Sequence, residues 1–382
     1  LIGEIFQVTK EELPRRVPRS VPVTSPDGAR IGEMLKEMFG DFYDGGRLLD
    51  QKDLNGQTPE IFITTSNRNA GKTTYFGSKL VRNFKRKGVK FGLICRYTYE
   101  LDSAAESFFK GIQPLFFPDD QMSSKIRRKG TYADLFLNDQ HCGAVLPLNK
   151  AEQIKKVSQY FYDIDVLFFD EFMPESNVYL PDEVDKLMSI HTSVARGNGK
   201  QVRYVATWMC GNPYTILNPY YTALGITGRL RKDTKFLRGD GWVMEQGFNE
   251  SAAEAQKGSA FMRAFSSQKY AAYAAEGVYL ADNEAFIEKP EGTSRYLATI
   301  RYENQEFAIR QFSELGLIYC DDKPDRSFPL RISVTTEDHD INYVMLHMND
   351  IFISNMRFYF EHGAFRFKDL RCKNAVIALL SY

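Results

Sequence analysis

Apolar residues along the first two thirds of the chain form short runs, and turn residues separate one run from the next. The runs Glu60–Thr65 and Val89–Cys95 flank a segment with the pattern of a helix, which ends near Gly88. A strand, a helix and a second strand in this order form a βαβ unit, and such units place their strands in a parallel sheet. The pattern therefore predicts an α/β fold.

Three later segments extend the predicted sheet. Residues 163–171 predict a strand around the continuous apolar run at 166–169, which is typical of a strand buried on both faces. Residues 201–212 and 241–247 predict two more strands, and Pro181–Arg196 predicts a helix with acidic residues in its first turn. Residues 97–162 mix helical pattern with loop.

The two ends of the chain have a different character. Pro, Arg and Ser dominate the opening stretch, which predicts an extended arm with a short helix at 31–39. The sequence becomes Ala-rich and helical after Phe248, and short strands follow from Tyr296, among them residues 357–360 and 375–380. We expect three parts: an α/β domain with its arm over 1–248, a helical linker over 249–295 and a small α+β domain over 296–382.

Composition narrows the function classes. The 382 residues are 43% apolar and 26% charged, as in soluble globular proteins, and 49 basic residues balance 49 acidic ones. A strongly basic nucleic-acid binder is excluded, although local basic patches are not. The five cysteines are scattered without a C-x-x-C pair, which favours free thiols in a reducing compartment over a zinc site. The sequence shows neither an apolar run of about 18 residues nor a signal pattern, so we expect no membrane anchor.

The loop after the first predicted strand has the pattern of a phosphate-binding loop, G-x-x-x-x-G-K-[ST], with serine in place of the first glycine. Such a loop binds phosphate with main-chain N–H groups at a helix N-terminus, while its Lys reaches the β- and γ-phosphates and its Thr binds Mg²⁺. Serine is compatible with the first position if φ is negative there. The alternative is an ordinary strand-to-helix turn. The candidate nucleotide-binding residues of this loop are Ser66, Asn67, Arg68, Asn69, Ala70, Gly71, Lys72, Thr73 and Thr74.

A second motif strengthens the nucleotide hypothesis. The buried strand at 163–171 ends in Asp170 and Glu171. In ATPases with a phosphate-binding loop, such an Asp holds Mg²⁺ together with the loop Thr, here Thr73, and a following Glu activates the attacking water. The pair therefore favours ATP hydrolysis over phosphate transfer to a small molecule. The alternative is a buried strand that ends in a solvated acidic turn.

Three further polar residues follow predicted elements. Arg196, at the end of a helix and beside Gly197, is placed to act as an arginine finger on a neighbouring subunit, or else to cap its own helix. Asn212 ends a strand, where it can sense the γ-phosphate or form an Asn-Pro turn. Arg96 ends the second strand and faces phosphate, the catalytic Glu or solvent. Gln57, just before the first predicted strand, is a weak candidate for a residue of the adenine pocket.

These motifs resemble a known family. The loop "SNRNAGKT", the run "VLFFDE", the segments "ARG" and "CGNP", and the small β-rich domain at the end are similar to the DNA-packaging ATPases of small tailed phages. These are terminase-like motors of the additional-strand, catalytic-glutamate class of P-loop NTPases. The resemblance covers the layout of most of the chain, and it is specific in the ATPase half only. It implies ATP and Mg²⁺ as cofactors, with Lys72, Thr73, Asp170 and Glu171 at the Walker positions and Arg196 as the trans-acting arginine.

The resemblance also implies partners. It implies a homo-oligomeric ring, expected to be a pentamer, docked on the portal protein of a prohead in the host cytoplasm, where it drives double-stranded DNA inward. Some relatives also bind a structural RNA. Large terminases carry a C-terminal RNase H-like nuclease, which needs acidic residues on neighbouring strands. Here Thr299 and Arg301 occupy the first strand of the last domain, so we expect a vestigial nuclease domain without activity.

DNA is held mainly through its phosphates by Lys and Arg. Three basic runs are candidates for this contact, although such runs are also typical of solvated surfaces. We favour the run at 125–129, which we expect to be a flexible loop that lines a pore, with Lys125, Arg127, Arg128 and Lys129 as the contacts. The other two runs supply Arg82, Lys85, Arg86, Lys87 and Lys90, and Arg229, Arg231 and Lys232.

Two other functions fit the same motifs. One is a helicase or other oligomeric ATPase that acts on nucleic acid. The other is a binding or scaffold protein whose nucleotide is structural and is not hydrolysed.

Overall fold

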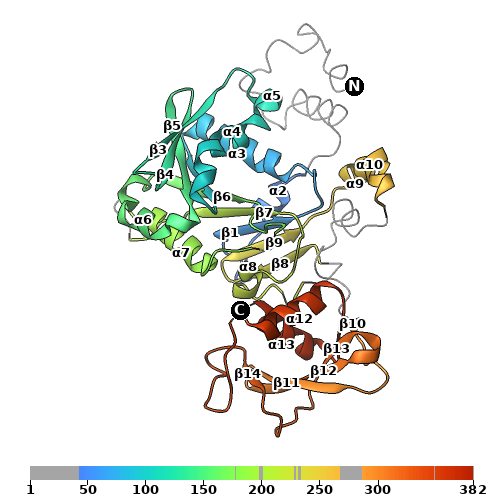
Figure 1. The fold of residues 1–382 in the computed structure, drawn as a ribbon. Helices are drawn as coiled ribbons and strands as arrows, with labels where there is room; N and C mark the ends of the chain where they lie inside the picture. Colours follow the sequence, from blue (N-terminus) through green and yellow to red (C-terminus); the bar gives the residue numbers. More distant parts are fainter. Residues whose placement is uncertain are drawn as a thin grey trace. The chain divides into compact units, whose positions relative to one another are not determined.

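The apolar runs of the first part of the chain form a nine-stranded sheet that is mostly parallel (Figure 1). The strand order is β3-β4-β5-β2-β6-β7-β1-β9-β8. The strands from β5 to β9 in this order pair in parallel, and antiparallel strands extend both edges. The strands are β1 Ile61–Thr65, β2 Lys90–Cys95, β3 Met122–Arg127, β4 Tyr132–Leu137, β5 Gln140–Pro147, β6 Ile164–Asp170, β7 Ala206–Gly211, β8 Phe236–Gly239 and β9 Trp242–Gln246.

The computed structural model describes residues 43–176, 178–197, 201–227, 229–230, 234–266, 286–347 and 349–381. The predicted N-terminal arm and its helix at 31–39 lie outside the described residues, as do Arg231, Lys232 and the linker residues 267–285. In the described part of the chain, no helix has the length and apolar character that crossing a membrane requires.

Helices accompany this sheet, and α3 has a glycine at each of its ends. It begins after Gly71 and ends before Gly88, and both glycines have positive φ. Phe76, Leu80 and Val81 on its buried face join the same core cluster as residues of the sheet. The basic last turn of α3 complements the negative end of the helix dipole. The helices are α2 Gly46–Leu49, α3 Lys72–Lys87, α4 Leu101–Lys110, α5 Gln113–Phe116, α6 Ala151–Lys156, α7 Glu183–Val194, α8 Pro219–Ala223, α9 Glu250–Gly258 and α10 Ala260–Ala264.

The register of the parallel strands brings three loops to one edge of the sheet. β7 lies between β6 and β1. Thr65, the last residue of β1, pairs with Gly211, and Asp170, the last residue of β6, pairs with Cys210. The segments that follow β1, β6 and β7 therefore leave the sheet side by side, where ligands bind in open α/β sheets.

Residues 97–162 contain strands that the sequence pattern did not predict. β3, β4 and β5 form successive hairpins at one edge of the sheet. The turn residues Arg128 and Lys129 have φ of 49° and 55°, and Asn138 and Asp139 have φ of 48° and 63°. Consecutive positive φ values are typical of tight hairpin turns. The expectation of a flexible loop at 125–129 is wrong, because this segment is the end of β3 and a tight turn.

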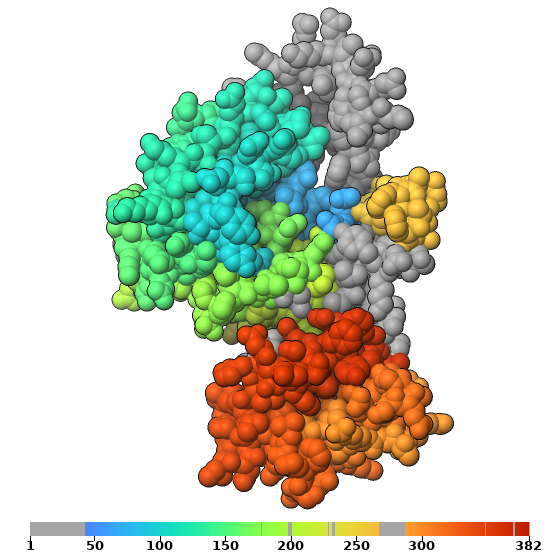
Figure 2. All heavy atoms as spheres, in the orientation of Figure 1, coloured from blue at the N-terminus to red at the C-terminus, as the bar shows by residue number. Residues whose placement is uncertain are grey.

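A second, six-stranded sheet forms in the last part of the chain, in the order β10-β15-β13-β12-β11-β14. Figure 2 shows residues from 286 onward, in orange to red, as one continuous body. β11, β12 and β13 pair antiparallel, and β14 lies parallel to β11. The elements are β10 Phe286–Ile287, β11 Arg295–Tyr302, β12 Gln305–Phe312, β13 Leu317–Asp321, β14 Arg331–Ser333, α12 Ile351–Glu361, β15 Phe365–Phe367 and α13 Leu370–Ser381.

Two strand predictions in this part are wrong. Residues 357–360 lie in α12 and residues 375–380 lie in α13. Residues 375–380 are all buried, so α13 shows no polar face over that stretch. A short apolar run of this kind does not distinguish a buried helix from a buried strand.

All five cysteines are free and buried. Burial raises the pKa of the Cys142 thiol to about 12. Burial also raises the thiol pKa of Cys95, Cys210 and Cys320. These side chains therefore pack as small apolar groups.

Candidate nucleotide-binding site

The loop between β1 and α3 has the main-chain conformation of a phosphate-binding loop with a serine at its start. Gly71 has φ of 92°, and Asn69 also has positive φ, at 59°. Ser66 is not among the residues with positive φ, so this position does not require glycine. The main-chain N–H of Tyr43 donates to the carbonyl of Ala70 at 2.8 Å and supports the loop from behind. α3 then begins at Lys72.

Lys72 is buried, and its ammonium group is held by the loop and by Asn212, which directly follows the neighbouring strand β7. Its Nζ donates to Ser66 Oγ at 2.8 Å, to the carbonyl oxygens of Ser66 and Asn67 at 3.1 and 3.2 Å, and to Asn212 Oδ1 at 3.0 Å. Burial lowers the pKa of Lys72 to about 8. A cation that is this poorly solvated gains strongly from a phosphate nearby.

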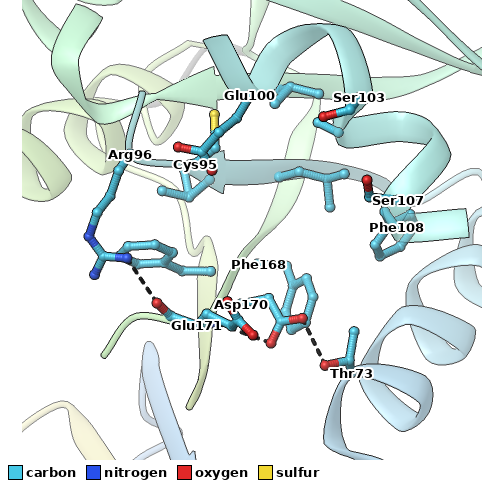
Figure 3. Close-up of a pocket in the computed structure, with 15 residues that line it drawn as sticks. Thr73, Cys95, Arg96, Glu100, Ser103, Ser107, Phe108, Phe168, Asp170 and Glu171 are labelled. Atoms are coloured by element: carbon cyan, nitrogen blue, oxygen red, sulfur yellow. Dashed lines mark hydrogen bonds between the residues drawn. The ribbon is translucent and has the colours of Figure 1, made fainter. Parts of the chain in front are cut away.

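Thr73 and Asp170 form an oxygen pair across the sheet edge. The Thr73 hydroxyl donates to Asp170 Oδ2 at 2.7 Å (Figure 3). Burial raises the pKa of Asp170 to about 6, and the Thr73 hydrogen bond opposes this shift. A hydroxyl and a carboxylate are ligand types that Mg²⁺ takes when phosphate and water oxygens complete its shell, so these two residues fit that ion. In the described ranges, no cluster of three His, Cys, Asp or Glu residues could hold a metal by itself.

Glu171 lies in a strained turn directly after β6. It has φ of 52°, a conformation that costs a non-glycine residue about 1–3 kcal/mol. The turn is fixed on three sides. The Glu171 N–H donates to Asp170 Oδ1 at 3.1 Å, its carbonyl accepts from Arg96 at 2.9 Å, and the N–H of Phe172 donates to the carbonyl of Cys210 at 3.1 Å. The Glu171 side chain remains exposed.

Arg96 is a buried residue that holds the acidic turn, and it is not a surface arginine. Its guanidinium donates to the main-chain carbonyl of Glu171 (Figure 3) and to that of Phe172. It also pairs with Glu183 at 3.0 Å, and the Tyr220 hydroxyl donates to the same carboxylate at 2.8 Å. Sequence reasoning missed Glu183, because it reads as an ordinary acidic residue in the first turn of a helix. The pair ties β2, β6 and α7 together.

A cavity of about 320 Å³ opens beside the acid pair. Thr73, Asp170 and Glu171 line one side, and Arg96 and the α4 region line the other (Figure 3). Glu100, Ser103 and Ser107 contribute polar atoms to this second side. Apolar side chains such as Leu93, Val145 and Phe168 also line the cavity. The cavity therefore offers a space of mixed character next to the groups expected to bind Mg²⁺ and water.

Two further candidates from the sequence, Arg68 and Arg196, are not part of the contacts described above. Arg68 forms an ion pair with Glu175. Arg196 is exposed just after α7, and its side chain makes no hydrogen bond or ion pair with the described residues. The structure of one subunit thus brings together Lys72, Thr73, Asp170, Glu171 and Asn212, but not Arg196.

The favoured DNA-contact residues are partly engaged within the chain. Arg127 pairs with Asp134 at 2.5 Å. Arg128 donates to the Tyr160 hydroxyl at 2.7 Å and lies over the Tyr160 ring. Lys125 lies on β3, and Lys129 lies in the exposed turn beside it.

Four residues of the other basic runs are also engaged, whereas Arg86 and Lys87 are exposed at the end of α3. Lys85 pairs with Asp120, and Lys90 pairs with Asp163. Arg82 lies over Phe116, and Arg229 lies over Trp242.

Comparison with known proteins decides the family. The family model of the podovirus DNA encapsidation protein (Gp16) matches residues 43–381. The chain belongs to this family. The DNA packaging protein of Bacillus phage phi29 is 23% identical to this encapsidation-family chain over 316 residues, which is 82% of this chain and 90% of that protein. The DNA packaging protein of Bacillus phage B103 is 22% identical over 306 residues, with 78% and 90% covered.

Solved structures show the same fold. A chain of the bacteriophage Phi-29 viral genome packaging motor assembly is similar with a TM-score of 0.53 and 20% identity, over 87% of this chain and 97% of that chain. The Phi-28 gp11 DNA packaging motor is similar with a TM-score of 0.56 and 16% identity, over 89% and 98%. These two chains therefore share the mixed α/β fold over 87% and 89% of this chain.

Proposed function

We propose that this encapsidation-family chain is an ATPase that drives double-stranded DNA into a prohead as one subunit of a ring. The observation that carries the proposal is the meeting of three loops at one sheet edge. Lys72 contacts Asn212 at 3.0 Å there, Thr73 contacts Asp170 at 2.7 Å, and Glu171 follows in a strained turn. Membership of a DNA encapsidation family supplies the substrate.

The residues divide the chemistry as follows. The main chain from Ser66 to Gly71 wraps the phosphates, and Lys72 neutralises the β- and γ-oxygens. Thr73 and Asp170 would hold Mg²⁺, and the ion would supply positive charge to offset the charge that develops on the transferred phosphoryl group. The Glu171 carboxylate accepts a proton from the attacking water while the water oxygen bonds to the γ-phosphorus. The bond between the γ-phosphorus and the bridging oxygen breaks, and ADP is the leaving group.

Asn212 and Arg96 act around this centre. Asn212 Oδ1 accepts a hydrogen bond from the Lys72 ammonium group, so the Asn212 side chain is placed to respond when that group moves. Arg96 binds the main chain of the acidic turn, so it acts by holding Glu171 and does not touch phosphate. The position of β7 between β6 and β1, together with Glu171 directly after β6, supports the additional-strand, catalytic-glutamate class as part of this proposal.

Arg196 acts between subunits in this proposal. Its side chain is exposed and has no partner among the described residues of its own subunit. A subunit that packs against this face would receive the guanidinium at its γ-phosphate, where it stabilises transition-state charge. A closed ring, expected to be a pentamer, repeats this contact at each interface and docks on the portal protein of the prohead in the host cell, with a structural RNA as a further partner.

The last part of the chain serves as a gripping domain in this proposal, a vestigial nuclease over 296–382 joined by a linker over 249–295. Support comes from its acidic residues, which are engaged by arginines. Asp321 pairs with Arg310, and Glu306 pairs with Arg331. Carboxylates held in this way are poorly disposed to bind two metal ions.

The deciding experiment measures ATP hydrolysis by the purified chain with and without linear duplex DNA. We expect DNA to stimulate hydrolysis and Lys72→Ala to lose it, because the variant lacks the cation that the phosphates need. Equal hydrolysis with and without DNA would contradict a translocating motor. Strand separation on a forked duplex would favour a helicase, and nucleotide binding without any turnover would favour a scaffold.

Nucleotide affinity is expected to depend on pH with two limbs. Asp170 must be ionised to hold Mg²⁺, so affinity rises as pH increases through about 6, the raised pKa of this carboxyl. Lys72 must be protonated to bind phosphate, so affinity falls as pH increases through about 8, its lowered pKa. Titration of the chain with fluorescent ADP in the presence of Mg²⁺, at pH values below, between and above these two pKa values, measures both limbs.

Lys72→Arg is the matched control for the alkaline limb. A guanidinium stays charged throughout this range, so the variant should keep the acid limb and lose the alkaline one. A flat profile in the parent chain would contradict the assigned roles of both residues.

A further inference from the structure

The Asn67 side chain points away from the lysine of its own loop and bonds to the segment that begins α9. It is fully buried. Its Nδ2 donates to the carbonyl of Asn249 at 3.0 Å, and its Oδ1 accepts from the N–H of Asn249 at 3.0 Å. The side-chain amide thus pairs with both main-chain polar groups of Asn249, as a residue does in a hydrogen-bonded pair of antiparallel strands. It continues a contact that starts at Gly247, whose N–H donates to the carbonyl of Thr65 at 2.7 Å.

A second side chain repeats the connection one residue further along the loop. Gln256 lies on α9, and its Nε2 donates to the carbonyl of Arg68 at 2.9 Å. Asn249 also caps α9, because its side chain accepts from the N–H of Ala252 at 2.7 Å. The first turn and the last turn of α9 are therefore both tied to the start of the phosphate loop.

The same stretch of loop main chain is bonded on its other side by the lysine. Lys72 Nζ donates to the carbonyls of Ser66 and Asn67, and Asn67 also holds Asn249. A phosphate that draws the ammonium group toward itself changes the bonds on one side of this main chain. The bonds to Asn249 and Gln256 on the other side carry any resulting shift to α9.

We propose that Asn67 and Gln256 are positioning residues that couple nucleotide binding at the phosphate loop to the order of α9. The inference rests on the proposed nucleotide binding. A purely structural contact would leave α9 unchanged when phosphate binds, whereas this coupling requires α9 to respond. α9 and α10 (yellow in Figure 1) follow β9 and open the stretch of chain that leads to the second sheet, so α9 is the first element beyond the ATPase site to receive this signal.

Hydrogen–deuterium exchange on the full chain, with and without Mg²⁺ and saturating ADP, tests the coupling. In the parent chain we expect ADP to slow amide exchange in residues 71–76 and, by about tenfold, in residues 252–258, a factor typical of a few stabilised hydrogen bonds. In Gln256→Ala, the protection of 71–76 should persist while that of 252–258 falls to about twofold or less. In Asn67→Ala, whose change lies in the phosphate loop itself, the protection of 252–258 should fall by a larger factor than that of 71–76.

Glu254→Ala is the matched control, because Glu254 is exposed on the same helix and has no side-chain partner among the described residues. It should behave as the parent chain. Undiminished α9 protection in both alanine variants overturns the coupling, as does an α9 in the parent chain that ignores bound ADP. If Asn67→Ala lowers the melting temperature strongly, Gln256→Ala decides alone. No ADP protection of residues 71–76 in the parent chain contradicts nucleotide binding itself, which is a distinct result.

Discussion

Replacing Arg196 with alanine is expected to lower the rate of ATP hydrolysis about 10³–10⁵-fold, the usual worth of an arginine finger. The variant should still bind ATP, because Arg196 contacts none of the loop residues of its own subunit. Hydrolysis by assembled rings, together with binding of a fluorescent ATP analogue, separates the two effects. Arg295→Ala is the matched control, because Arg295 is an exposed arginine on β11, away from the proposed ATPase site.

Mixing two inactive variants tests whether Arg196 acts in trans. Arg196→Ala subunits keep an intact Lys72, and Lys72→Ala subunits keep an intact Arg196. In a mixed ring, an Arg196→Ala site that lies beside a Lys72→Ala subunit has every required group, so part of the activity should return. Mixed rings that assemble but stay inactive would show that the arginine does not act across the interface.

Glu171→Gln is expected to slow hydrolysis about 10²–10⁴-fold, because an amide cannot accept the proton of the attacking water. ATP affinity should stay near that of the parent chain, since Asp170 and Thr73 remain in place. The turn should also survive, because Arg96 and Asp170 hold it through main-chain atoms of Glu171. Single-turnover hydrolysis and equilibrium binding measure the two quantities.

Glu152→Gln provides the comparison for this substitution, because Glu152 is an exposed glutamate on α6. It should leave hydrolysis unchanged. A Glu171→Gln variant that hydrolyses ATP at the parent rate would remove Glu171 from the role of general base and point to another acceptor at the cavity, such as Glu100.

The sequence predicted the parallel part of the fold well, because its elements carry strong local signals. The run at 163–171 is buried on both faces, and the helix after Gly71 has glycines at both of its ends. The antiparallel edge strands were missed, since β3 is largely exposed and lacks an apolar run. The pair Asn138 and Asp139, between two apolar runs, was a turn signal that could have revealed the β4–β5 hairpin.

The candidate site was predictable where one motif lies on one loop. The positions of Lys72 and Thr73 follow from their own segment, and the parallel register brings Asp170 and Asn212 beside them. What the sequence could not provide were contacts between distant segments. The pair of Arg96 and Glu183 joins residues 87 positions apart, and the pair of Asn67 and Asn249 joins residues 182 positions apart. No local pattern encodes which of several polar residues will meet.

The five buried thiols have a practical consequence for watching such a motor at work. Because all five cysteines are buried and burial raises the pKa of four of them, maleimide dyes should leave the native sulfurs largely unmodified in the folded chain. One cysteine introduced at a solvent-facing position, such as Glu152 on α6, can therefore carry a fluorophore without prior removal of the natural ones. Distances between dyes on adjacent copies would then be measurable during translocation.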